Sequence, residues 1–262
     1  MDTLVSPRDG RRDAASVPAA RRTRPTRGVL AREPQPQGRF APPVKRAESF
    51  YRRGAGLATL LSGLLVFVSI LMIPFDGVGS EGYLRSNAEH PDAIRWAAVV
   101  LHYGFLLLVP SAFGLAHLAR RGSRRLSNLG LLLAVLGSGL SGLMAVDFYD
   151  LALATTLPMD QAVKVYDAAG ATAGAAPLLI QLPSVVGTLV GSVLLAVAFC
   201  RAGFVRWPVP VLLLAGWVTF LATAQHFAGA AAGTALIAVA TALLGIRVLY
   251  ASDAEWDSGV VD

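Results

Sequence analysis

Long apolar stretches constrain this chain more than any other feature of its sequence. Each holds about 20 residues, the length of α-helix that crosses a hydrocarbon core about 30 Å thick. Lipid offers the backbone no hydrogen-bond partner, so each stretch must satisfy its own polar groups, as a helix does. The six stretches are residues 54–75, 94–119, 129–149, 177–200, 207–227 and 229–250. The sequence therefore predicts an all-α, polytopic six-helix transmembrane bundle over residues 51–250.

Composition supports a membrane protein and locates its charge. Of the 262 residues, 54% are hydrophobic and 15% charged, which is too apolar for an ordinary soluble domain. Residues 1–53 hold 13 Lys and Arg against 5 Asp and Glu, whereas residues 54–262 hold 10 against 12. The positive excess therefore lies in the N-terminal part, and we expect no nucleic-acid partner for the folded domain.

The two chain ends are predicted to be tails. Residues 1–50 are rich in Arg, Pro and Ala without apolar periodicity, which is typical of a disordered segment. No apolar run follows their charged residues, so a signal peptide is not expected. Residues 251–262 form a short acidic tail.

Basic residues in short loops predict the orientation. The loops at 120–125 (RRGSRR) and 201–206 (RAGFVR) are basic, whereas those at 76–92 and 150–176 hold more acid than base. The sequence therefore predicts a plasma-membrane protein with both termini in the cytoplasm. In the outer loops, Met159, Val163 and Tyr166 share one helical face, which predicts an amphipathic helix on the outer membrane surface. The segment SEGYLRSNAEHP favours a second helix, ended by Pro91.

Motifs for soluble catalysis are missing from the sequence. It holds no phosphate loop, no GxGxxG after a strand, and no HExxH, GxSxG or CxxC. The single cysteine, Cys200, excludes a disulfide framework and a multi-thiolate metal site. We therefore expect no enzyme activity, no cofactor and no metal. Pro110 and Pro183 lie inside spans and predict kinks.

Polar residues inside the spans give the candidate site. His102 lies about 8 Å inside the outer edge of the second span by helical rise, where an ionisable group needs a partner. Asp147, at the outer end of the third span, is the predicted partner, because a short loop makes these two spans neighbours. Gln181 and His226 reach the same side. The sequence predicts an outer polar cluster of His102, Asp147, Gln181 and His226.

Three functions remain open on this evidence. The first is a non-enzymatic protein that interacts with membrane proteins or envelope lipids. The second is a small-solute or proton-coupled transporter that uses the outer His/Asp cluster. The third is a redox subunit that binds a quinone or one haem, with His102 and His226 as the haem ligands. We expect the lipid bilayer as a partner and take the first function as the leading hypothesis.

One segment carries a resemblance. The run YLRSNAEHPDAIRWAAVVLHYGFLLLVPSAFGLAHLARRGSRRLSNLGLLLA resembles a stretch of six-helix integral membrane proteins of high-GC Gram-positive (actinobacterial) type. In these proteins an outer-loop His-Pro precedes a Trp and then a His early in the second helix. The resemblance implies the six-helix fold over residues 54–250 and implies no activity.

Reporter fusions test the orientation. A reporter placed after Asp262 should be active only in the cytoplasm, and one inserted within residues 156–170 only outside the cell, because the basic loops hold their side of the bundle inside. A fusion after Asp262 that is active only outside the cell would reverse the topology.

Overall fold

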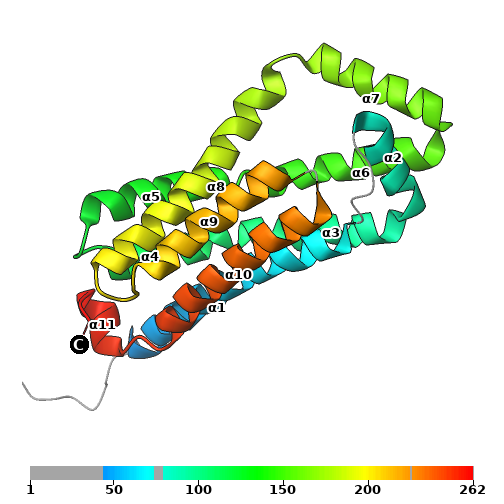
Figure 1. The fold of residues 1–262 in the computed structure, drawn as a ribbon. Helices are drawn as coiled ribbons and strands as arrows, with labels where there is room; N and C mark the ends of the chain where they lie inside the picture. The colour runs from blue at the N-terminus through cyan, green and yellow to red at the C-terminus, as the bar shows by residue number, and fades with distance from the viewer. Residues whose placement is uncertain (1–43, 74–78, 225, 262) are drawn as a thin grey trace, which may run out of the picture. The chain divides into compact units, whose positions relative to one another are not determined.

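The computed structural model describes residues 44–73, 79–224 and 226–261, and within these ranges the chain is helical without strands (Figure 1). The predicted tail lies outside the described residues as far as residue 43. The helices are α1 (Val44–Met72), α2 (Gly79–Glu89), α3 (Pro91–Leu106), α4 (Leu108–Ala119), α5 (Arg124–Gly137), α6 (Leu140–Thr156), α7 (Met159–Ala173), α8 (Ala176–Arg201), α9 (Pro208–Thr223), α10 (Phe227–Leu249) and α11 (Asp253–Ser258).

The membrane-spanning segments confirm the predicted all-α bundle. Five segments are long and apolar enough to cross a membrane: Ser49–Met72, Pro91–Ala119, Arg124–Thr156, Ala176–Arg201 and Phe227–Leu249. A shorter apolar helix, α9, takes the place of the predicted fifth span. Its 16 residues rise about 24 Å, less than a core of about 30 Å. The main differences in bounds are that α1 begins before residue 54 and α6 continues beyond residue 149.

Two spans are interrupted. The second is divided into α3 and α4 at Leu107, three residues before Pro110. A proline lacks the amide hydrogen of a regular turn and its ring crowds the carbonyl of residue 106, which explains the break there. The third span is divided into α5 and α6 at Ser138 and Gly139. By contrast, α8 continues through Pro183 without a break.

The spans pack in the order of the chain. The first span (α1) contacts the second, the second contacts the third, and so on to α10, which packs back against α1 (Figure 1). Helix α4 also contacts α8 and α10, so it lies toward the centre of the bundle. The side chains of Leu118, Leu195, Phe199, Leu213 and Leu244 are buried in the core that these helices enclose.

Glycines bring helix backbones into direct contact. A Cβ atom on Gly191 of α8 would lie 2.4 Å from the backbone nitrogen of Ala134 in α5. One on Gly245 of α10 would lie 2.7 Å from the carbonyl oxygen of Gly56 in α1. Small residues permit this approach, which is the usual basis of helix association in lipid. The pairs α5–α8 and α1–α10 are therefore fixed by backbone contact.

The loop helices α2 and α7 are present but pack differently from the prediction. Met159, Val163 and Tyr166 do lie on one face of α7, yet that face packs with Leu84 of α2 and Ala154 of α6 in a small separate core. The apolar face of α7 is thus turned toward protein, because α6 extends far enough to receive it. The helices α2, α6 and α7 together form what we call the α2–α7 end.

Glycine packing predicts a matched pair of substitutions. Gly191→Ala should lower the free energy of unfolding by about 1–3 kcal/mol, because the new methyl group meets backbone atoms that cannot move aside. A Cβ on Gly142 of α6 would meet no atom within 4 Å, so Gly142→Ala should be neutral or stabilising. Unfolding of the purified protein in mixed micelles with rising dodecyl sulfate measures both, and equal effects would contradict the packing described.

Candidate functional site

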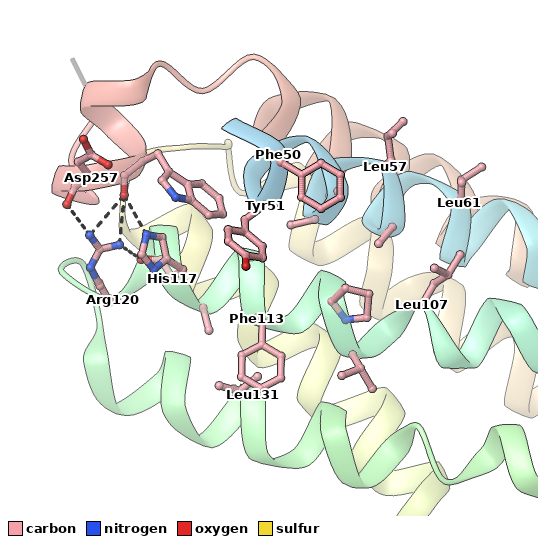
Figure 2. A pocket seen from close by; sticks show the side chains of 18 of the residues that line it. Phe50, Tyr51, Leu57, Leu61, Leu107, Phe113, His117, Arg120, Leu131 and Asp257 are labelled. Atoms are coloured by element: carbon pink, nitrogen blue, oxygen red, sulfur yellow. Dashed lines mark hydrogen bonds between the residues drawn. The ribbon is translucent and has the colours of Figure 1, made fainter. Parts of the chain in front are cut away.

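A groove lies on the side of the bundle, between α1, α4 and α5. Its volume is about 1130 Å³, with α1 and α5 as walls, α4 as floor and α11 at one end (Figure 2). We call it the lateral groove. The aromatic and aliphatic side chains that line it are those of Phe50, Tyr51, Leu57, Leu61, Leu107, Val109, Phe113, Leu131 and Trp256.

Small residues account for the volume of the lateral groove. The buried Ala55 and Ala58 of α1 and Gly114 of α4 line its deeper part, and the exposed Gly54 of α1 lines it as well. Larger side chains on the same helices are at the rim, where Phe113 is 55% exposed and points toward the α5 wall (Figure 2). The helices are therefore close at the floor and apart at the rim, which leaves a hollow open to the side.

One end of the lateral groove is polar. His117 at the end of α4 donates a hydrogen bond from Nε2 to the carbonyl oxygen of Trp256, 3.0 Å away (Figure 2). The two rings are tilted by 34° with their centroids 4.5 Å apart. Arg120 donates to the carbonyl oxygens of His117, Trp256 and Asp257. The polar groups at this end thus join α4 to α11.

Helix α11 is docked by further contacts. Ser252 and Glu255 form a capping box, in which the Glu255 amide donates to Ser252 Oγ at 3.0 Å and Glu255 accepts from the Ser252 amide at 2.7 Å. Asp253 pairs with Arg52 of α1 at 2.5 Å, and Glu255 pairs with Arg247 of α10. The segment predicted as an acidic tail therefore contains a helix that closes one end of the groove.

Part of this site was visible in the sequence. The spacing Ser252-x-x-Glu255 is that of a capping box and signals a helix start. A tryptophan in an otherwise acidic terminal segment signals a buried contact. The groove itself had no such signal, because it depends on small residues of two helices and a wall from a third.

The four residues of the predicted outer cluster each have surroundings that the structure describes. His102 of α3 is half-buried, and its Nδ1 lies 2.9 Å from the carbonyl oxygen of Ser141 in α6. Because a carbonyl only accepts, Nδ1 carries the hydrogen. His102 therefore contacts α6, the helix that holds Asp147. The contact is at Ser141, which precedes Asp147 by six residues, or about 9 Å along the helix axis. The direct bond from His102 to Asp147 stays a prediction.

Asp147 belongs to the α2–α7 end. One turn further along α6, the buried Asp150 accepts a hydrogen bond from the Tyr83 hydroxyl of α2 at 3.1 Å. Burial raises the pKa of Tyr83, a hydrogen bond with Asn87 lowers it, and the negative charges of Asp147 and Asp150 raise it further. Burial and the same two carboxylates, with Asp167, also raise the pKa of Tyr166. The negative charge of Asp147 thus acts on both Tyr83 and Tyr166.

The other two predicted members are exposed. Gln181 lies in the first turns of α8, where the neighbouring Leu179 and Ile180 are also exposed. His226 is exposed at the residue preceding α10. A common pocket of all four residues stays a prediction. Within residues 44–73, 79–224 and 226–261, no three His, Cys, Asp or Glu side chains are grouped as a metal site requires.

No protein-family model, curated protein or solved structure matches this chain.

The Tyr83–Asp150 bond predicts a specific loss of stability. Tyr83→Phe should lower the free energy of unfolding by about 1.5–3 kcal/mol, because a buried carboxylate loses its hydrogen-bond donor. Tyr149 of α6 is 73% exposed, and Tyr149→Phe should stay within about 0.5 kcal/mol of the parent. Unfolding in mixed micelles measures the difference, and indistinguishable variants would show that the Tyr83 hydroxyl does not stabilise the α2–α7 end.

Proposed function

We propose that this multi-pass membrane protein is non-enzymatic and binds a membrane lipid in the lateral groove. The observation that carries the proposal is the groove itself, a cavity of about 1130 Å³ with aromatic and aliphatic walls on a membrane-spanning surface. An apolar hollow on that surface meets acyl chains rather than water, and a lipid chain fills it without loss of hydrogen bonds.

The length of the lateral groove fits one leaflet. Along the α1 wall it runs from Phe50 to Leu61, eleven residues or about 16 Å of helix. Half of a hydrocarbon core of about 30 Å is about 15 Å. The polar end with Arg120 then lies at the membrane surface and the apolar end near the midplane. This arrangement suits one phospholipid with its headgroup at α11.

We further propose that the groove opens to the cytoplasmic leaflet. The 120–125 and 201–206 turns meet at one end, where a Cβ on Gly122 would lie 2.6 Å from Ala202 Cα. We call this the arginine end, and α11 docks there through Arg52 and Arg120. The positive-inside rule assigns such an end to the cytoplasm, and with it both described chain ends. We therefore propose that the protein is located in the plasma membrane.

The chemistry at the polar end supports binding rather than catalysis. His117 Nε2 donates to the Trp256 carbonyl, and Arg120 donates to three carbonyls. An imidazole that donates from this nitrogen cannot use it as a general base. These groups hold helices together, and an amphiphile can lie beside them without a reaction. The apolar walls likewise favour a lipid over a polar transported solute.

A groove-filling variant tests the proposal. A Cβ on Gly54 in the α1 wall would meet no atom within 4 Å, so Gly54→Phe should place its ring in the groove without moving α1. Retained phospholipid, counted by native mass spectrometry of the detergent-purified protein, should fall about tenfold, as a steric penalty of ~1.4 kcal/mol would give.

The matched control is Gly142→Phe, because Gly142 is equally open but outside the lateral groove. It should retain as much phospholipid as the parent protein. No retained lipid in the parent, or equal retention in both variants, would contradict lipid binding in the groove.

A further inference from the structure

The charge of Arg120 is not balanced by a carboxylate contact. Its guanidinium donates to backbone carbonyls, which are neutral. Over the part of the chain that the structure describes, the ion pairs engage Arg52, Arg85, Arg95 and Arg247. Arg120 therefore brings a full positive charge to the end of an apolar groove.

The surroundings of Arg120 make a bound anion favourable. Burial lowers the pKa of Arg120, and the neighbouring Arg121 lowers it further, while Asp257 acts in the opposite direction. Arg124 and Arg125 follow at the start of α5, which is the other side of the same turn. An arginine stays protonated under these conditions. An anion beside the turn would offset both the burial and the repulsion between cations.

Donors at this end suit phosphate oxygens. Asn128 of α5 and Tyr51 of α1 line the groove as Arg120 does, and both side chains are exposed. An amide and a phenol can each donate a hydrogen bond to an acceptor that enters the groove. Phosphate accepts several hydrogen bonds at once and binds most strongly to guanidinium groups. The walls beyond, at Leu57 and Leu61, are apolar.

We propose that the lateral groove selects a phospholipid of net negative charge, with its phosphate at the end that Arg120 and Asn128 line and an acyl chain along Leu57 and Leu61. This inference rests on the proposed function, since it names the headgroup of the lipid held there. It commits to a lipid of the surrounding leaflet because the charged end and the apolar length fit one amphiphile. Free phosphate carries the negative charge but has no acyl chain. Residues 1–43 could supply apolar side chains, but they carry no excess of negative charge.

Lipid competition tests the headgroup. The full-length protein in detergent is incubated with equal amounts of phosphatidylglycerol and phosphatidylcholine of identical acyl chains, and native mass spectrometry counts each bound species. The parent protein should bind phosphatidylglycerol about tenfold more often, because each arginine near the groove attracts a headgroup of net negative charge. Inorganic phosphate added in excess should not displace it.

Two charge variants locate the selection. Arg120→Gln should reduce the preference about fivefold, because it removes the positive charge at the end of the groove. Arg206→Gln removes the same charge from an exposed residue of the 201–206 turn, which does not line the groove, and should keep the preference. If Arg120→Gln fails to fold, Arg121→Gln removes the adjacent exposed charge and should reduce the preference in the same direction.

The outcomes separate the two proposals. Bound lipid without headgroup preference overturns the inference and leaves lipid binding in place. An equal loss in Arg206→Gln overturns it too, because the charge would then act over the whole surface. A preference for the anionic headgroup that persists in Gly54→Phe would overturn binding in the groove. Lipid that binds only after residues 1–43 are deleted would overturn it as well. No bound lipid in the parent contradicts the proposed function as well.

Discussion

Backbone contact at glycines is the constraint on which the rest of this bundle depends. In lipid, apolar side chains gain little by leaving one apolar surface for another, so helices are held where small residues allow close van der Waals packing. Gly191 on α8 and Gly245 on α10 supply such contacts against α5 and α1. The close pairs α5–α8 and α1–α10 fix four of the spans, and α4 lies between them.

The lateral groove is a consequence of this arrangement. Where α4 meets α1, Gly114 approaches Ala55 closely at the floor, whereas the exposed side chains of Phe113 and Leu61 line the groove. The hollow ends at α11, whose position is set by Arg120, Arg52 and Arg247. The same glycine packing that stabilises the bundle elsewhere therefore leaves one side open, next to a cluster of positive charge.

Sequence patterns predicted the fold well but did not indicate the lateral groove, for physical reasons. Membrane spans are a local property of about 20 apolar residues, so their number and positions could be predicted. Pro110 predicted a kink in the second span, and the structure has a break at Leu107. The hydrogen bond from His102 to Ser141 could not be predicted, because its acceptor is a backbone carbonyl, which every residue type provides. The face of α7 was predicted, but its packing on α6 depended on how far α6 extends. The groove depended on three helices at once.

Photo-crosslinking from within the groove tests most directly whether it holds an anionic lipid. Benzoylphenylalanine replaces Phe113, which points into the groove, and in a second protein it replaces Val218, 56% exposed on α9. Both proteins are illuminated in membranes of mixed phospholipids, and the adduct masses are determined. We expect anionic phospholipid adducts to be enriched at position 113, with the bulk lipid mixture at position 218. Adducts at position 113 to peptides of this chain, or the same lipid mixture at both positions, would contradict a selective lipid site.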